Sequence, residues 1–238
     1  EAVEVLRQFK GFSYFTEMSD IINRLEDHVA SARMKTTPVI DFEKNESLKG
    51  LDYLDTIYHA IVNEHPIQLK YRSFKARSAN NFIFYPYLLK EYRNRWFVYG
   101  VRGNGRILQN LALDRIQSLE VLPQEHYIKN TFFDPNTFFD DLVGVTKNSG
   151  SVAEKIGFKV AAAEAPYIIT KPIHRSQQLV ERLPDGSVIL EIEVVINHEL
   201  ERVFFGYVDG IEILYPKTLI ELMSRKLEKA AKQYTKSK

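Results

Sequence analysis

The sequence predicts an α+β protein, and three changes of pattern along its 238 residues support that fold class. Before residue 65, apolar residues recur at spacings of three and four, which indicates amphipathic helices. From residue 67 to residue 122 they alternate in short runs rich in aromatic and branched side chains, which indicates strands. Beyond residue 150, strand patterns and helix patterns follow each other in turn. A chain of this length suffices for one to two domains.

Residues 1–65 are expected to form a helical linker or dimerisation region. An apolar stripe from Phe12 to Val29 predicts one helix, and a stripe from Leu51 to Ile61 predicts a second. Gly50 precedes the second stripe and Pro66 follows it, as breakers do at helix ends. Two helices are therefore expected to lead into the strands.

Residues 66–128 are expected to form a small β-barrel or a curled sheet. Five short runs carry the strand pattern, at 67–74, 82–89, 95–101, 107–113 and 116–122. Gly103-Asn104-Gly105 lies between two of them, where residues that tolerate positive φ close a hairpin. A phosphate-binding loop is the alternative for this glycine pair, but no third glycine and no helix pattern follow. The hairpin is therefore the better interpretation.

A linker with a short helix at 138–143 is expected over residues 129–150, and a second domain over residues 151–238. In that domain the predicted order is strand, helix, strand, strand, helix and a strand at 211–215, followed by one long helix. This order is the plan of a ferredoxin-like split βαβ domain. The strand that begins at Ser187 alternates Val, Leu and Ile with Glu, which is typical of an antiparallel strand with one buried face.

Composition and motifs give no support for an enzyme. The chain has no cysteine, which excludes disulfides, thiolate metal ligands and cysteine nucleophiles and fits a reducing, cytoplasmic setting. Its six histidines are scattered, and His198-Glu199 lacks a second histidine at Arg202, where a zinc-protease helix would carry it. We therefore expect no catalytic residues, no metal and no cofactor. No apolar run approaches the roughly 18 residues of a membrane span, so no membrane partner is expected.

Basic and aromatic residues concentrate in the strand region. The whole chain has a formal net charge of only +1, but between Pro66 and His126 ten bases stand against four acids, a local charge of +6. Seven of those ten bases are arginine, whose planar fork matches phosphate. Ten aromatic residues lie between Tyr71 and Tyr99, and interleaved rings and bases are how sheet surfaces hold nucleic acids. A solvated basic face over a ring-filled barrel core is the alternative.

Three separated segments of the strand region resemble the WYL-domain family, namely Tyr85–Leu89, Asn94–Gly100 and Asn110–Ile116. Trp96-Phe97-Val98 stands at the position of the namesake Trp-Tyr-Leu. Ala165-Pro166-Tyr167 and Ile213–Pro216 are similar to the C-terminal WCX extension of the family. The stripe that ends at Val29 is similar to the linker that follows the family's N-terminal winged helix-turn-helix.

The resemblance implies a bacterial transcription regulator whose Sm-like barrel senses a ligand and controls a DNA-binding domain. It implies a basic ligand groove lined by Tyr71, Ser73, Tyr85, Arg93, Arg95, Phe97 and Arg115. Phe97 replaces the namesake tyrosine and cannot make a hydroxyl hydrogen bond, and Asp114 leaves an ion-pair role open for Arg115. Residues 1–50 show no helix-turn-helix pattern, so this chain alone is not expected to bind operator DNA specifically.

Two functions from different classes follow from these observations. The first is the ligand-sensing and dimerising region of a transcriptional regulator, in which a nucleotide or a single-stranded nucleic acid binds the basic barrel face and shifts the N-terminal helices. The second is a nucleic-acid-binding module without a switch. An enzyme acting on a phosphate ester has little support. Wide apolar faces on the first and the last predicted helix favour a homodimer.

Overall fold

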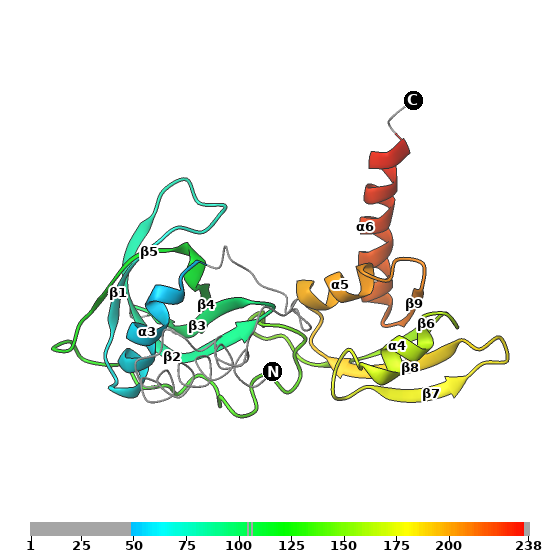
Figure 1. Cartoon of the computed structure of the whole chain (residues 1–238), viewed down its shortest axis with the longest axis horizontal. Coiled ribbons are helices and arrows are strands. Elements are labelled where there is room, and N and C mark those ends of the chain that lie inside the picture. Colours follow the sequence, from blue (N-terminus) through cyan, green and yellow to red (C-terminus); the bar gives the residue numbers. More distant parts are fainter. Residues whose placement is uncertain (1–48, 104, 106, 236–238) are drawn as a thin grey trace, which may run out of the picture. The chain divides into compact units, whose positions relative to one another are not determined.

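The computed structural model describes residues 49–103, 105 and 107–235, and Figure 1 shows them coloured along the chain. The helix expected from Phe12 to Val29 lies outside these residues. The chain divides into two compact units, the first ending at Phe132 and the second beginning at Phe133. Each combines helical segments with an antiparallel sheet, which confirms the α+β class.

The first unit packs one helix against a five-stranded sheet. A 3₁₀ turn, η2 (Leu51–Tyr53), leads into α3 (Leu54–Val62). The strands are β1 (Ile67–Tyr71), β2 (Asn80–Tyr92), β3 (Arg95–Arg102), β4 (Gln109–Ala112) and β5 (Ile116–Val121), arranged in the order β4-β3-β2-β1-β5. A second 3₁₀ turn, η3 (Leu113–Arg115), joins β4 to β5.

The core of the first unit lies between α3 and the sheet. Leu54, Ile57 and Ala60 recur every three residues on α3 and are buried in one cluster with Ile67 of β1 and Phe84 of β2. Burying a large apolar side chain contributes about 1.5–3 kcal/mol, so this stripe fixes the helix on the sheet.

The segment that follows β5 is held on β2 by two tyrosines. The Tyr87 hydroxyl donates to the Ile128 carbonyl at 2.9 Å, and the Tyr127 hydroxyl donates to the Pro86 carbonyl. Burial raises the pKa of Tyr87 to about 12, so its hydroxyl keeps its proton at neutral pH. The Phe132 ring stacks on Tyr87 with 6.1 Å between the centroids. The chain up to Phe132 therefore packs with the first unit.

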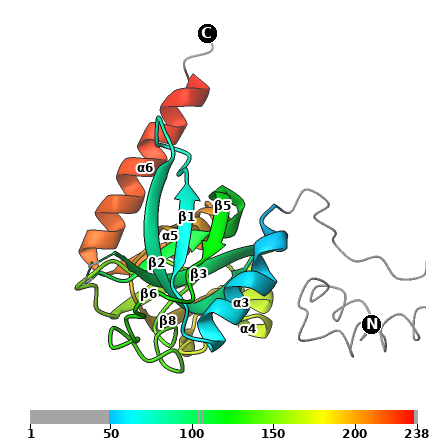
Figure 2. The same ribbon diagram turned by 90° about the vertical axis from the view of Figure 1, so that its left-hand side faces the viewer.

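The second unit is a four-stranded antiparallel sheet with three helices among the described residues. Its elements are β6 (Glu154–Val160), α4 (Ala165–Thr170), β7 (Gln178–Arg182), β8 (Val188–Val194), α5 (His198–Phe205), β9 (Ile211–Tyr215) and α6 (Lys217–Thr235). The strand order is β7-β8-β6-β9. Its core joins Phe158 of β6, Leu190 of β8, Phe204 of α5 and Leu219 of α6. Figures 1 and 2 show α6 extending past this sheet.

Residues 133–150, expected as a linker, fold onto the second unit. The side-chain amide of Asn197 donates to the carbonyls of Val143 and Thr146 at 3.0 and 2.9 Å. The short helix expected at 138–143 is replaced by turns over residues 135–141. The Asp134 carboxylate accepts the Asn136 N–H at 2.9 Å, and the Asp134 carbonyl accepts the Phe138 N–H at 2.9 Å, so the chain turns here without continuing into a helix.

None of the helices in the described part of the chain combines the length and the apolar character needed to cross a membrane.

Candidate ligand-binding cleft

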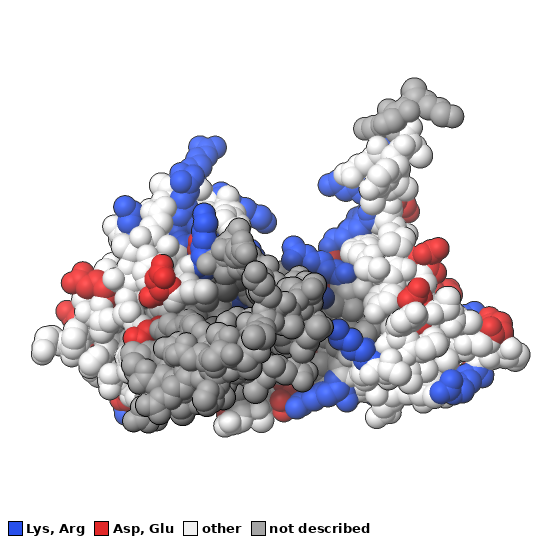
Figure 3. Space-filling model, in the orientation of Figure 1, with Lys and Arg blue, Asp and Glu red and all other residues white. Residues whose placement is uncertain are grey.

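A cleft of about 280 Å³ opens in the first unit between the loop after β1 and the η3 turn. Its lining comprises Arg72, Ser73, Phe74, Asp114, Arg115, Ile116 and Gln117. Figure 3 shows lysine and arginine side chains gathered around the end of the β1–β2 hairpin, whose loop begins beside this cleft. The predicted basic surface is therefore hollowed at this place.

The pairing of β1 with β5 brings the two sides of the cleft together. Tyr71 lies opposite Ile116, and the ladder shifts register between Lys70 and Tyr71. One residue further, the Arg72 N–H donates to the Arg115 carbonyl at 3.1 Å. The loop after β1 is thus fixed beside η3, although the two segments lie more than forty residues apart in the sequence.

Asp114 lies between two arginines at the floor of the cleft. The Arg95 Nε lies 3.3 Å from Asp114 Oδ2, and the Arg115 Nε lies 3.9 Å from Asp114 Oδ1. The second distance is too long for a hydrogen bond. Asp114 Oδ1 and Arg115 Nε are both buried and have no hydrogen-bond partner among the described residues. Such unsatisfied buried atoms are uncommon in proteins, and each costs free energy.

Tyr71 supports Arg115 from the side of the core. Burial raises the pKa of the Tyr71 hydroxyl above its ordinary value, although the Arg115 guanidinium, which also hydrogen-bonds it, acts in the opposite direction. The hydroxyl therefore stays protonated at neutral pH and can hold the guanidinium in place.

Phe74 is an exposed ring at the rim of the cleft. The Arg115 guanidinium carbon lies 4.4 Å from the centroid of this ring, a cation–π distance. The Phe74 side chain is 73% exposed, so the ring still presents surface to a ligand. Exposed rings are a common stacking surface for nucleobases in proteins that bind single strands, and each such stack contributes about 1–3 kcal/mol.

Rings and guanidinium groups lie next to one another in a row that runs from the cleft across the sheet. Arg102 lies 4.0 Å over Phe82, and Phe82 meets Tyr71 edge-on with 6.4 Å between the centroids. Tyr71 contacts Arg115, which in turn lies over Phe74. We call these five residues the basic-aromatic row: Arg102, Phe82, Tyr71, Arg115 and Phe74.

The structure brings four of the seven predicted site residues together, namely Tyr71, Ser73, Arg95 and Arg115. Tyr85 lies elsewhere, because its buried ring packs edge-on against Tyr127 with 6.1 Å between the centroids. Phe97 pairs with Lys90 and Ala112 inside the sheet. Arg93 lies in the β2–β3 turn at φ 51°, with its guanidinium 5.5 Å over the Tyr92 ring.

Phe74 and Gln117 line the cleft and are absent from the predicted site. The only sequence signal for Phe74 was its membership of the aromatic run, and Gln117 carried none. Across the described residues, no group of three or more histidines and carboxylates is placed to hold a metal ion.

Comparisons with known proteins agree with this two-part organisation. A family model described as "WYL domain" matches residues 52–121, and one described as "WCX domain" matches residues 153–231. No curated protein matches the chain.

Two solved structures are similar to the chain. Proteasome accessory factor B/C (PafBC) of Arthrobacter aurescens has 16% sequence identity and a TM-score of 0.37, and the alignment covers 87% of this chain and 31% of that chain. A CRISPR Cas-related protein has 12% sequence identity and a TM-score of 0.46. The alignment covers 78% of this chain and 52% of that chain. This chain therefore spans about a third of the first structure and about half of the second.

Proposed function

Because this chain belongs to the WYL-domain family and joins a WYL domain to a WCX domain, we propose that it is the ligand-sensing and dimerising region of a bacterial transcriptional regulator. DNA would be bound by a helix-turn-helix domain that its sequence does not contain. The regulator would act in the cytoplasm and without a cofactor. The two domains would have an Sm-like barrel fold and a ferredoxin-like fold, as their strand orders support.

The ligand is a nucleotide or a single-stranded nucleic acid held on the basic face of the first unit. The observation that carries this proposal is the basic-aromatic row, in which two guanidinium groups lie over rings and the exposed Phe74 ring stands beside a cleft. Guanidinium groups neutralise phosphates, and a ring such as Phe74 stacks a base.

A ligand at Asp114 and Arg115 would also act on the chain that enters the first unit. Gly50 has φ 86°, and a Cβ added there would lie 2.5 Å from the Leu113 carbonyl carbon and 2.8 Å from the Asp114 nitrogen. The segment at Gly50 therefore lies directly against η3. A ligand that prefers one position of η3 would favour one position of the N-terminal helical region, which is what a sensor requires.

A nucleic-acid-binding module without a switch is the second candidate. Such a module would bind nucleic acid in the same cleft, but the contact between Gly50 and η3 would have no role in its function. Operator affinity of the full-length regulator separates the two, because only a sensor changes that affinity when the ligand binds.

The direct test is fluorescence anisotropy of labelled single-stranded and duplex DNA and RNA across a salt series. We expect single-strand binding that weakens steeply with salt, with a slope that falls by about 0.7 for each phosphate contact removed. Arg95→Ala and Arg115→Ala should each weaken binding. Arg93→Ala is the matched control, since Arg93 is an arginine of the same unit that lies outside the cleft.

Equal losses for Arg93→Ala and Arg115→Ala would show that binding does not centre on the cleft. Absence of binding at low salt for every oligonucleotide would overturn a nucleic-acid ligand and leave a small anion.

A further inference from the structure

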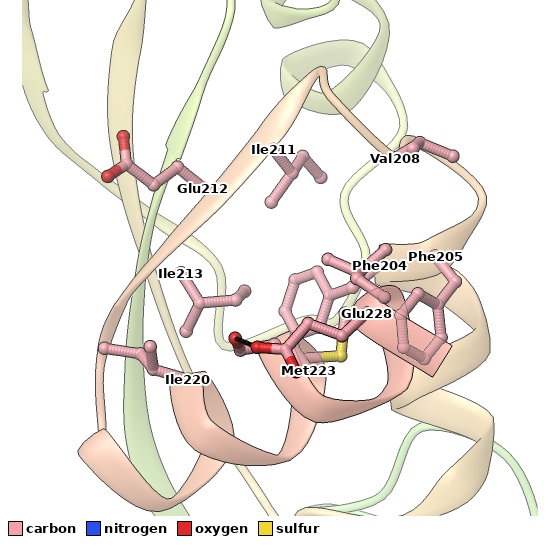
Figure 4. A pocket seen from close by; sticks show the side chains of 11 residues that line it. Phe204, Phe205, Val208, Ile211, Glu212, Ile213, Ile220, Met223 and Glu228 are labelled. Atoms are coloured by element: carbon pink, nitrogen blue, oxygen red, sulfur yellow. Dashed lines mark hydrogen bonds between the residues drawn. The ribbon is translucent and has the colours of Figure 1, made fainter. Parts of the chain in front are cut away.

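The second unit has an apolar groove of about 380 Å³ between α5, β9 and α6. Figure 4 shows side chains of all three elements converging on it, among them Phe204, Phe205, Ile213, Ile220 and Met223. Sites for small ligands have volumes of about 300–1,000 Å³ and combine apolar walls with a few polar groups. The groove therefore has the size and the walls of a small-molecule site.

The charged groups of the groove are carboxylates. Glu228 lines it from α6 and Glu212 from β9. Ser224 lies one turn before Glu228 on α6, with its Oγ 3.5 Å from Glu228 Oε1. Among the described residues that line the groove, none is lysine or arginine. An anionic ligand would therefore be repelled here, and a cationic group would be attracted.

Glu228 is the carboxylate that is available to a ligand. Glu212 lies opposite Lys159 in the pairing of β9 with β6. In the part of the chain that the structure describes, Glu228 forms no ion pair, although Lys232 stands one turn further along α6. A cation that enters the groove thus finds a carboxylate without a charged partner beside the apolar walls.

The loop between α5 and β9 is strained where it borders the groove. Val208 has φ 40°, a left-handed conformation that a β-branched residue rarely adopts. Its side chain lines the groove and is 61% exposed. Strained backbone of this kind costs stability and clusters at sites that bind ligands. The strain is a second indication, independent of charge, that the groove receives a ligand.

We propose that the groove binds a small hydrophobic amine, with its apolar body against Phe205, Ile213 and Met223 and its ammonium group at the Glu228 carboxylate. Burial of the apolar body supplies most of the affinity. The carboxylate selects the amine over an alcohol or an acid of the same length. This site is separate from the cleft of the first unit, which carries Arg72 and Arg115 and favours anions.

Calorimetric titration of the full chain with decylamine, decanol and decanoate tests the proposal. The three probes share an apolar chain of similar length and differ in the charge of the head group at neutral pH. We expect one decylamine to bind per chain, with a dissociation constant on the order of 10–100 µM. Decanoate should bind at least about tenfold more weakly, and decanol should lie between the two.

A variant that fills the groove tests where the amine binds. Ser224→Trp places a large ring in the groove from an exposed position of α6 and should abolish decylamine binding. The matched control is Arg225→Trp, because Arg225 is the next residue of the same helix and does not line the groove. Circular dichroism of both variants establishes that they fold.

A second variant tests the role of charge. Glu228→Gln should weaken decylamine binding about threefold to fivefold, as for an exposed ion pair, and leave decanol binding unchanged. Glu221→Gln is the control, since Glu221 is an exposed acid of the same helix that lies outside the groove. It should change neither affinity.

Equal affinity for decylamine and decanoate, or binding that survives Ser224→Trp, would overturn the proposal. Absence of binding by all three probes would also overturn it, and would be the result if another protein segment already covers the groove. Oligonucleotide binding by the same protein decides separately on the proposed function. A chain that binds single strands but no decylamine would keep that function and lose the amine site.

Discussion

Three of the seven residues that line the cleft of the first unit are charged, whereas eight of the eleven that line the groove of the second unit, between α5, β9 and α6, are apolar. The cleft is formed by a loop and a 3₁₀ turn, and the groove by two helices and a strand. Binding of an anionic ligand at the cleft should therefore weaken with salt, while binding of an apolar group in the groove should change little. Salt concentration is the variable that separates the two surfaces.

The largest effect is expected from Phe204→Ala, which removes a ring shared by the core and the groove. Phe204 is 2% exposed and meets Phe158 with 5.3 Å between the centroids. We expect a loss of about 3–5 kcal/mol in unfolding free energy, measured by urea denaturation. Because each unit has its own core, oligonucleotide affinity should change by less than about twofold. A parallel loss of affinity would show that cleft and groove are coupled. Val180→Ala, at an exposed position on β7, is the control.

The next effect is expected from Gly50→Ala, which tests the contact between Gly50 and η3. Alanine at φ 86° is strained, and its Cβ would also lie 2.5 Å from the Leu113 carbonyl carbon. Gly150→Ala is the matched control, since Gly150 has φ 79° but nothing within 4 Å of the added Cβ. Strain alone costs about 1–3 kcal/mol. Gly50→Ala should therefore lower the melting temperature more than Gly150→Ala does. Equal shifts would show that the close approach of Gly50 to Leu113 does not contribute to the loss of stability.

Asp114→Asn tests how the cleft balances its charges. Asp114 repels phosphate, so its neutralisation should raise affinity for single strands about fivefold, equivalent to ~1 kcal/mol, in anisotropy at low salt. Glu120→Gln, an exposed acid on β5 outside the cleft, should change affinity less. A weaker complex with Asp114→Asn would instead mean that this carboxylate accepts a hydrogen bond from the ligand.

The smallest effect is expected from pH acting on His174 in the second unit. Burial, reinforced by the charge of Arg175, lowers the pKa of this imidazole below its ordinary value. The unfolded chain therefore takes up the proton first, and unfolding free energy should fall as the pH drops below about 6.5. His174→Gln should flatten this decline in denaturation experiments, and His126→Gln, at an exposed position, should not. An unchanged slope would assign the acid sensitivity to other groups.

Local pattern was sufficient to locate most elements of the fold. The strand predicted over residues 211–215 is β9 with the same bounds, and the five predicted runs correspond to β1–β5. The helix expected at 138–143 did not form, although Phe138, Phe139, Leu142 and Val143 have helical spacing. The segment forms turns instead, and Asn197, over fifty residues away, binds the Val143 carbonyl. Sequence periodicity cannot report such a distant partner.

The candidate site was harder to predict because it depends on strand pairing. Ser73 and Arg115 meet only because β1 pairs with β5, and a register shift at Tyr71 decides which side chains face the cleft. Tyr85 lies in a segment that matches the family pattern and Phe97 stands at the position of the namesake tyrosine, yet neither lines the cleft. The contact of Phe74 with Arg115 follows from a loop conformation for which the sequence holds no local signal.

The hydrogen bonds of Tyr87 and Tyr127 join β2 to the segment that follows β5. They also determine where this chain can be divided, by recombination or in the laboratory, without loss of contacts. A fragment that stops before Tyr127 would leave the buried Tyr87 hydroxyl without its acceptor at Ile128, a cost of about 1–3 kcal/mol. A division after Phe132 keeps both bonds and the stacked ring. The portion that can be transplanted intact into another protein therefore extends beyond the last strand of its sheet.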